Sequence, residues 1–369
     1  MIHPFGQLEH RSLENRSQRG FTLVELLVTL SIIGILATAM LGVAAVASDT
    51  AREAKTRHMI SRLHTLLMEQ VDSYKTRRVP LQDVIRDQIS AQVASQNRGK
   101  ALANARLYAL RELMLMELPD RWSDILLANV GSLPNGPIYL EDRPGLSKVY
   151  LRRFQHIYGA NNKLTGNTNT TEQIIRHQGA ECLYLVITLA TADGEARSLF
   201  GESSIGDVDG DGAPEFLDGW GNPISFLRWA PGVESDAQLN ANTFGSLSNP
   251  NTAIWKVAAA GDHDPFDMYR RESTAFRTLP LIFSGGPDEI YGIYTGGGAH
   301  DSKNSTSASP LVWHNNSPGI IENSAPFIRP ILSPFQPTGN VSVSSPYLGT
   351  TMNSDQTTDN IHNHLIAGQ

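Results

Sequence analysis

The first feature of the chain is a long apolar segment close to its start. Residues Leu26–Ala47 are 22 residues without a charged side chain. At about 1.5 Å per helical residue they extend for roughly 33 Å, enough to cross a bilayer core of about 30 Å. The preceding residues 1–20 are polar and contain three Arg and two Glu. The pattern predicts one membrane-spanning helix with its charged leader on the cytoplasmic side.

The helix is predicted to continue beyond the membrane as an amphipathic spine that ends at Arg78. Residues 49–78 contain neither Gly nor Pro. Apolar side chains recur there at spacings of three and four, which places them on one helical face. A globular head is expected to cover this stripe, which consists of Ile60, Leu63, Leu67, Val71 and Tyr74.

The remaining pattern predicts an α+β head. Residues 83–118 are predicted to form one or two helices, and Trp122–Tyr150 an irregular stretch. The apolar run Glu181–Thr191 has no period that separates a strand from a helix, so both stay open. Short β-prone runs separated by turn residues predict an antiparallel sheet; they cover 224–229, 254–258, 279–283 and 290–294.

These patterns divide the chain into six segments. The first two are a leader and a transmembrane helix, followed by the spine, a helical insertion, an α/β head and an irregular tail rich in Gly, Ser, Asn and Pro. Their predicted bounds are 1–20, 21–47, 48–80, 81–160, 161–300 and 301–369.

Composition narrows the function classes. The chain has 30 basic and 37 acidic residues, a net charge of −7, and no cluster of Lys and Arg. A nucleic-acid groove therefore has no electrostatic support, and no nucleic-acid partner is expected. The single cysteine, Cys182, excludes an intramolecular disulfide and a zinc site of four thiolates, and its apolar surroundings predict burial.

The segment Arg19-Gly20-Phe21-Thr22-Leu23-Val24-Glu25 resembles the processing site of type IV prepilins and of the pseudopilins of type II secretion. The resemblance implies a pilin-like fold, with cleavage after Gly20 by a prepilin peptidase and methylation of the new amine of Phe21. It also implies a single-pass protein of the bacterial inner membrane with a periplasmic head. The implied partners are membrane lipid, an inner-membrane assembly platform and other pilin-like subunits.

Glu25 is an unusual residue at this depth. A carboxylate within a membrane helix costs about 2.5–3.5 kcal/mol on insertion scales. No Lys, Arg or His lies between Phe21 and Ala51, so within one subunit the only cation on offer is the amine that cleavage creates. The resemblance implies that Glu25 pairs with this amine in a neighbouring subunit of a polymer. The alternative for a monomer is a side chain that extends to the headgroups.

An alternative interpretation is that the N-terminal segment is an ordinary secretory signal peptide. Ala45-Val46-Ala47 satisfies an A-x-A cleavage rule. The apolar segment is longer than the usual 7–15 residues of such a peptide, which favours the prepilin interpretation.

An acidic loop in the head matches a calcium-binding pattern. Residues 207–218 match the EF-hand loop at several positions, with an aspartate in place of the usual terminal glutamate. The predicted calcium ligands are Asp207, Asp209, Asp211, the backbone carbonyl of Ala213, Glu215 and Asp218. The alternative is a polar turn without metal.

Two further segments resemble the major pseudopilin of type II secretion. They are Asp218-Gly219-Trp220-Gly221-Asn222-Pro223-Ile224, where Gly219 stands in place of the family's proline, and a Ser-x-Gly-x-Asp-like loop at 284–289. The resemblance makes Ser284 and Asp288 candidate ligands of a second metal loop. A tight turn is the alternative.

The sequence gives little support for an enzyme. Residues 201–206 lack the second glycine of a nucleophile elbow. The sequence therefore predicts a structural assembly subunit and no enzyme. The second hypothesis is a membrane-anchored or secreted calcium-dependent binding module, and the third is an exported hydrolase.

Overall fold

The computed structural model describes residues 21–126, 137–159, 174, 176–190, 198–233, 235–239, 261–272, 275–295, 347–352, 354 and 357–367. The chain divides into two compact units, residues 1–50 and 51–369, and the boundary falls within the first helix. Predictions for the leader and Gly20, for a strand over 254–258 and for the tail over 301–346 lie outside the described residues.

The first unit is described from residue 21 and is helical from Leu23 onward. Helix α1, Leu23–Ser73, is the one helix among the described residues that is long and apolar enough to cross a membrane. Every described side chain up to Thr50 is exposed, as expected of a segment surrounded by lipid. A signal sequence near the N-terminus can pass the same test of length and composition.

In the second unit, the remainder of α1 confirms the predicted apolar stripe. Its buried residues are Thr56, Met59, Ile60, Leu63, Leu67 and Val71. The helix ends at Ser73, before the predicted Arg78. Beyond this end, the backbone N–H groups of Tyr74 and Lys75 donate to carbonyls three residues back rather than four. Tyr74 also donates a hydrogen bond to the carboxylate of Glu117, and Arg77 forms an ion pair with it.

Among the described residues, five helices lie between the spine and the first strand. They are α2 (Asp83–Gln92), α3 (Arg98–Glu117), α4 (Trp122–Leu126), α5 (Gly145–Tyr158) and α7 (Gln178–Ala190), with a 3-10 turn at Ser95–Asn97. The prediction of an irregular Trp122–Tyr150 is wrong at both ends, which are helical. The Glu112 carboxylate on α3 accepts hydrogen bonds from the backbone N–H groups of Ile138, Tyr139 and Leu140. These bonds fix the segment that precedes α5.

The described residues of the head also form two small antiparallel sheets. One pairs β1 (Ile205–Gly206) with β2 (Glu215–Phe216), and the other has the order β3 (Ser225–Leu227), β4 (Leu281–Ser284), β5 (Ile361–His362). The prediction of a strand over 290–294 is wrong, because this segment forms a single bridge, Ile293 to Thr351. Together with the long helix, these elements form an α+β pilin-like fold, as predicted.

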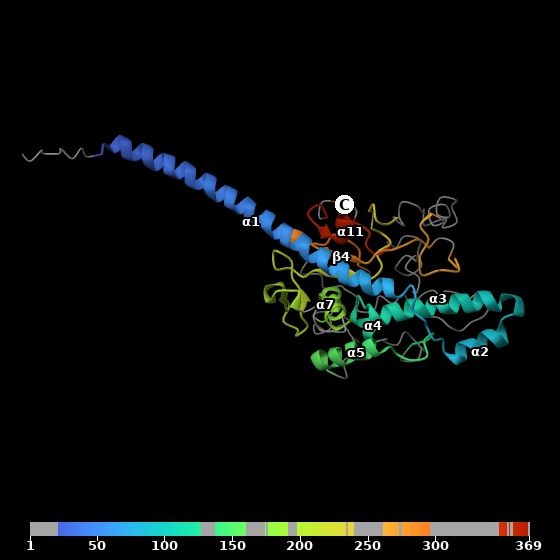
Figure 1. Cartoon of the computed structure of the whole chain (residues 1–369). Helices are drawn as coiled ribbons and strands as arrows, with labels where there is room; N and C mark the ends of the chain where they lie inside the picture. Colours follow the sequence, from blue (N-terminus) through green and yellow to red (C-terminus); the bar gives the residue numbers. More distant parts are fainter. Residues whose placement is uncertain are drawn as a thin grey trace, which may run out of the picture. The chain divides into compact units, whose positions relative to one another are not determined.

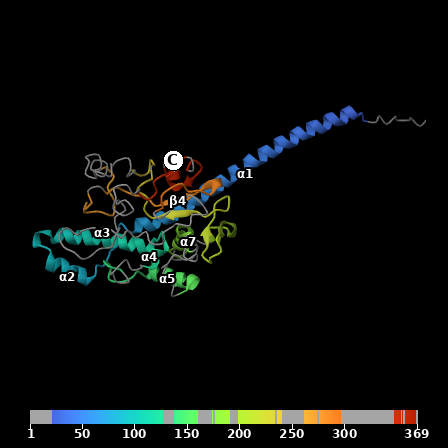
Figure 2. The same ribbon diagram turned by 180° about the vertical axis from the view of Figure 1, so that it is seen from behind.

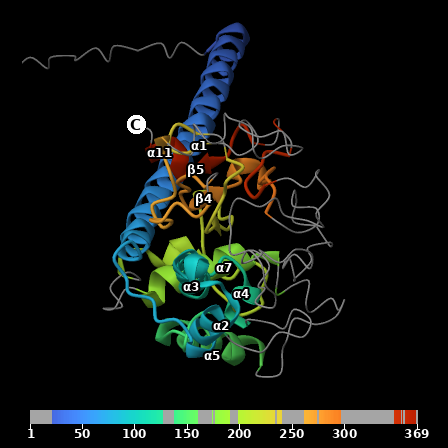
Figure 3. The ribbon, with the colours of Figure 1, turned by 90° about the vertical axis from the view of Figure 1, so that its right-hand side faces the viewer.

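The sheet β3-β4-β5 lies between helices. The helix α7 packs on β2 and β3, and α11 (Asn363–Ala367) packs on β4. In Figure 1 and Figure 3, α7 and α11 lie on opposite sides of β4, and Figure 2 shows this layering from behind. The apolar run after Glu181 is therefore a helix rather than a strand. Part of the tail that was predicted to be irregular, residues 361–367, is a strand and a helix packed on the sheet.

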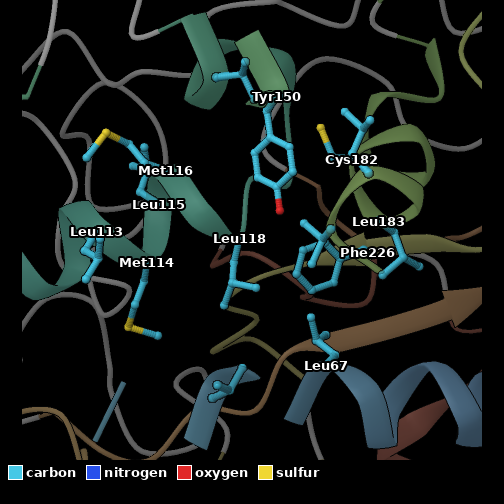
Figure 4. Close-up of a cluster of buried hydrophobic side chains, with 14 of the residues drawn as sticks. Leu67, Leu113, Met114, Leu115, Met116, Leu118, Tyr150, Cys182, Leu183 and Phe226 are labelled. Atoms are coloured by element: carbon cyan, nitrogen blue, oxygen red, sulfur yellow. The ribbon is translucent and has the colours of Figure 1, made fainter. Parts of the chain in front are cut away.

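One hydrophobic core connects the spine helix to the helices and to the sheet of the head. Leu67 of α1, Leu118 after α3, Tyr150 of α5 and Phe226 of β3 all belong to one buried cluster. Figure 4 shows these side chains converging, with Cys182 of α7 beside them. Cys182 is free and buried, as predicted.

Candidate functional site

The start of α1 is closed by a capping box. The backbone N–H and the hydroxyl of Thr22 each donate to Oε2 of Glu25, both at 2.9 Å. The N–H of Glu25 donates to Oγ1 of Thr22 at 3.2 Å. This reciprocal arrangement satisfies donors at the helix start that have no partner within the helix. Phe21 precedes the box and is 85% exposed.

Thr22 is a partner of Glu25 that sequence analysis missed. The Thr-x-x-Glu spacing was the available signal, because it is the capping-box pattern. The contact leaves the charge of Glu25 in place, since a hydroxyl and an amide are neutral.

The acidic loop connects β1 to β2, and Asp207 folds it. Oδ1 of Asp207 accepts the N–H groups of Gly210 and Asp211 at 2.7 and 3.1 Å, and Oδ2 accepts that of Gly212 at 2.9 Å. Gly210 and Gly212 have φ angles of 76° and 95°, which explains their glycines. Ala213 is buried and its N–H donates to Asp211 at 2.8 Å.

Three carboxylates meet behind this loop. Oxygen atoms of Glu181, Asp209 and Glu215 lie within 4.8 Å of one another, and so do those of Asp207, Asp209 and Asp211. Glu181 comes from α7, and sequence analysis missed it. Its Oε2 accepts a hydrogen bond from the indole N–H of Trp122.

With all of its carboxylates ionised, the cluster is electrostatically unfavourable. Burial and the charge of Asp211 raise the pKa of Asp209 to about 6. Burial, with the charges of the loop aspartates, raises the pKa of Glu215 to about 8. Burial also raises the pKa of Glu181 well above its usual range, and Asp211 and Glu215 add to the effect. These directions follow because burial and neighbouring negative charge both oppose ionisation.

Asp218, the predicted last calcium ligand, is not among the carboxylates that lie together here and is bonded elsewhere. Its Oδ1 accepts the N–H groups of Trp220 and Asn222 at 2.8 and 2.9 Å. Its Oδ2 accepts the hydroxyl of Ser284 at 2.7 Å. The side chain therefore closes the turn that follows it and ties this turn to β4.

The second predicted metal loop is also not assembled in the described residues. Ser284 is bonded to Asp218 and accepts the N–H of Gly286 at 3.1 Å. Oδ1 of Asp288 accepts the N–H of Ile290 at 2.8 Å, within a short 3-10 turn. Both residues act as turn formers, the alternative considered for them.

The contacts of Gly219 account for the glycine that stands here in place of the proline of the major pseudopilin. Its N–H donates to Oγ1 of Thr56 on α1 at 2.8 Å. A Cβ on Gly219 would lie 2.2 Å from the carbonyl oxygen of Arg52. A proline, which the family has here, lacks the N–H and carries the Cβ. The turn therefore approaches the spine helix closely only because this residue is glycine.

The comparison with protein families gives one match. Residues 15–41 match the prokaryotic N-terminal methylation motif. No curated protein and no solved structure shows a significant match to the chain. The match covers the predicted cleavage site, Phe21 and Glu25, and it supports a type IV pilin-like protein processed by a prepilin peptidase. It also supports a single-pass membrane anchor and polymerisation with other pilin subunits.

Proposed function

We propose that the chain is a structural subunit of a type II secretion pseudopilus or of a related type IV pilus-like filament. The observation that carries the proposal is the methylation-motif match over residues 15–41, which coincides with an exposed apolar helix. Such a helix is stable in lipid or among like helices, and Glu25 supplies the charge that fixes their register. The subunit lies in the inner membrane with its head in the periplasm, and an inner-membrane platform assembles it. It catalyses no reaction.

Calcium is the proposed cofactor of the head. The support is the loop of residues 207–215, which carries four carboxylates on a folded backbone, with those of Asp207, Asp209 and Asp211 within 4.8 Å of one another. Modules outside the cytoplasm bind calcium at about 10⁻⁴–10⁻³ M, so an exported head is filled where calcium is millimolar. Calcium then stabilises the folded head by mass action.

The first experiment is mass spectrometry of the chain extracted from membranes. The expected N-terminus is an N-methylated Phe21. A chain that starts at Ser48 would favour the second candidate function, an exported calcium-dependent binding module, because the segment ending at Ala47 would then be a signal peptide. A chain that still starts at Met1 in a host with an active prepilin peptidase would refute processing.

The second experiment separates assembly from helix capping. Glu25→Ala is expected to insert in the membrane as well as the wild type, because it removes a costly charge, and to lose intersubunit crosslinking. Thr22→Ala is the matched control, because it removes the capping hydroxyl and keeps the charge. Thr22→Ala is expected to crosslink nearly as well as the wild type. Equal losses in both variants would mean that Glu25 acts only as a cap.

A further inference from the structure

The strongest unexplained feature of the head is a set of buried carboxylate oxygens without hydrogen-bond partners. Glu181 is 1% exposed and Glu215 is 0% exposed. Oε1 of each has no hydrogen-bond partner, and neither oxygen of Asp209 has one. Buried polar groups are nearly always satisfied, so four such oxygens in one place indicate a missing ligand.

The three carboxylates lie close together, and each has an oxygen to spare. Oε2 of Glu181 is occupied by Trp122, and Oε2 of Glu215 accepts the N–H of Val208 at 3.2 Å, which leaves Oε1 of each without a partner. One carboxylate oxygen each of Glu181, Asp209 and Glu215 lies within 4.8 Å of the other two. Three carboxylates at this distance repel one another unless a proton or a cation lies between them.

We propose that Glu181 is a ligand of the cation bound by the acidic loop, in a site formed by Glu181, Asp209 and Glu215 with Asp207 and Asp211 on its exposed side. This inference rests on the proposed binding of calcium by the loop. It replaces the last position of the EF-hand pattern, Asp218, by a glutamate from a different element. The cation then bridges α7 and the β1-β2 hairpin.

Calcium fits this donor set better than other common cations. The ligand atoms lie within 4.8 Å of one another, and two oxygens bound to one calcium at about 2.4 Å can be at most this far apart. Magnesium prefers distances of about 2.0–2.1 Å and retains several waters, which suits a buried set of carboxylates less well. Zinc prefers nitrogen and sulfur ligands, and the cluster contains no His or Cys.

The position of the site gives the cation a structural role. The helix α7 packs on both β2 and β3, so a ligand on α7 connects the loop to the sheet of the head. The hydroxyl of Tyr158, the last residue of α5, donates to Oδ2 of Asp211. Calcium at this point therefore holds α5, α7 and the hairpin together.

The test compares four forms of the full-length protein in detergent: the wild type, Glu181→Gln, Asp209→Asn and Asp218→Asn. Melting temperature is measured in EDTA and in millimolar CaCl₂, and terbium luminescence reports binding directly, since Trp122 and Tyr158 contact two of the carboxylates. Glu181→Gln keeps an acceptor for Trp122 and removes the charge. Its melting temperature in EDTA is expected to equal or exceed that of the wild type, which shows that it folds.

The expected result is an apparent calcium Kd at least about tenfold weaker in Glu181→Gln and in Asp209→Asn. Asp218→Asn is expected to melt at a lower temperature in both buffers and to keep the wild-type calcium Kd. Full calcium binding by Glu181→Gln, together with its loss in Asp218→Asn, would overturn the role of Glu181 and restore the EF-hand order. A wild type that binds neither calcium nor terbium would overturn calcium binding as a whole, while the N-terminus at Phe21 would still decide the filament function.

Discussion

Substitution of Gly219 is a sensitive test of how the head is fixed to the spine. In Gly219→Ala the new Cβ would lie 2.2 Å from the carbonyl oxygen of Arg52 and 2.7 Å from its carbonyl carbon and Cα. Real Cβ atoms do not approach backbone so closely, so the turn or the helix must shift. The shift lengthens the hydrogen bond from Gly219 to Thr56, whose side chain is fully buried.

The magnitude follows from two contributions. Insertion of an extra methyl group into a packed contact costs about 1–3 kcal/mol. Loss of the bond to Thr56 adds about 1 kcal/mol. The sum is roughly 2–4 kcal/mol, and at about 2 °C per kcal/mol for a large domain the melting temperature falls by about 4–8 °C. Gly219→Pro is expected to fall further, because proline has no N–H to donate.

Thermal unfolding of the full-length chain in detergent, followed by tryptophan fluorescence, measures the effect. Gly99→Ala is the matched control, since Gly99 lies in α3 and its added Cβ meets no atom within 4 Å. Alanine is the better helix former, so this control is expected to melt at the same temperature or slightly higher. A Gly219→Ala protein that melts within about 1 °C of the wild type would refute the close contact between the turn and the spine.

Two further predictions concern buried charge. Arg228→Met leaves the buried Asp120 and Asp124 without the guanidinium that contacts both, which is expected to destabilise the head by about 3–5 kcal/mol in urea unfolding. Addition of Asp124→Asn should recover part of this loss, and an unchanged single variant would contradict the ion network. Burial and the nearby His362 lower the pKa of His364 from 6.5 to about 4, so between these values the unfolded chain binds a proton that the folded chain does not. Stability must therefore fall as pH drops through this window, by about 2 kcal/mol at pH 5, and His364→Gln should flatten the slope between pH 7.5 and pH 5. Equal slopes in the two proteins would contradict this assignment.

Local periodicity predicted the parts of the fold that depend on one helical face. The spacing of Ile60, Leu63 and Leu67 required a buried stripe, and each of them is 0% exposed. The same periodicity gave no end point for the helix. Just beyond the end at Ser73, Tyr74 and Arg77 bind Glu117, a residue 40 or more positions away whose contacts no local pattern contains.

The C-terminal strand and helix illustrate the same limit. β5 has two residues and α11 has five, too few to produce a recognisable period. Asn363 holds them in place: its Oδ1 accepts the N–H of Ile282 at 2.9 Å and its Nδ2 donates to the carbonyl of Pro280 at 2.8 Å. A polar residue in a polar tail gave no indication of these buried contacts.

The acidic loop shows why a motif predicts residue types better than it predicts side-chain directions. The spacing of Asp207, Asp209 and Asp211 correctly placed three carboxylates around one loop. Glu181 carried a different signal. It is the one charged residue of the apolar run 181–191, and a charge buried in such a run needs a partner. Nothing in the local sequence indicated that Glu181 lies beside an acidic loop about 30 residues further on.

Asp218 and Glu215 are three positions apart and make different contacts. The EF-hand pattern would make both of them ligands of one ion. Glu215 ends in the carboxylate cluster with Asp209 and Glu181. Asp218 binds its own turn and Ser284 of β4, and the next residue, Gly219, donates to the spine helix. The strand β2 thus begins at the proposed cation and leads, two residues after its end, to the turn that contacts α1. Substitutions at Asp218 and at Glu181 must therefore differ in kind: the first loosens the attachment of the head to its spine with or without calcium, and the second alters only the response to the cation.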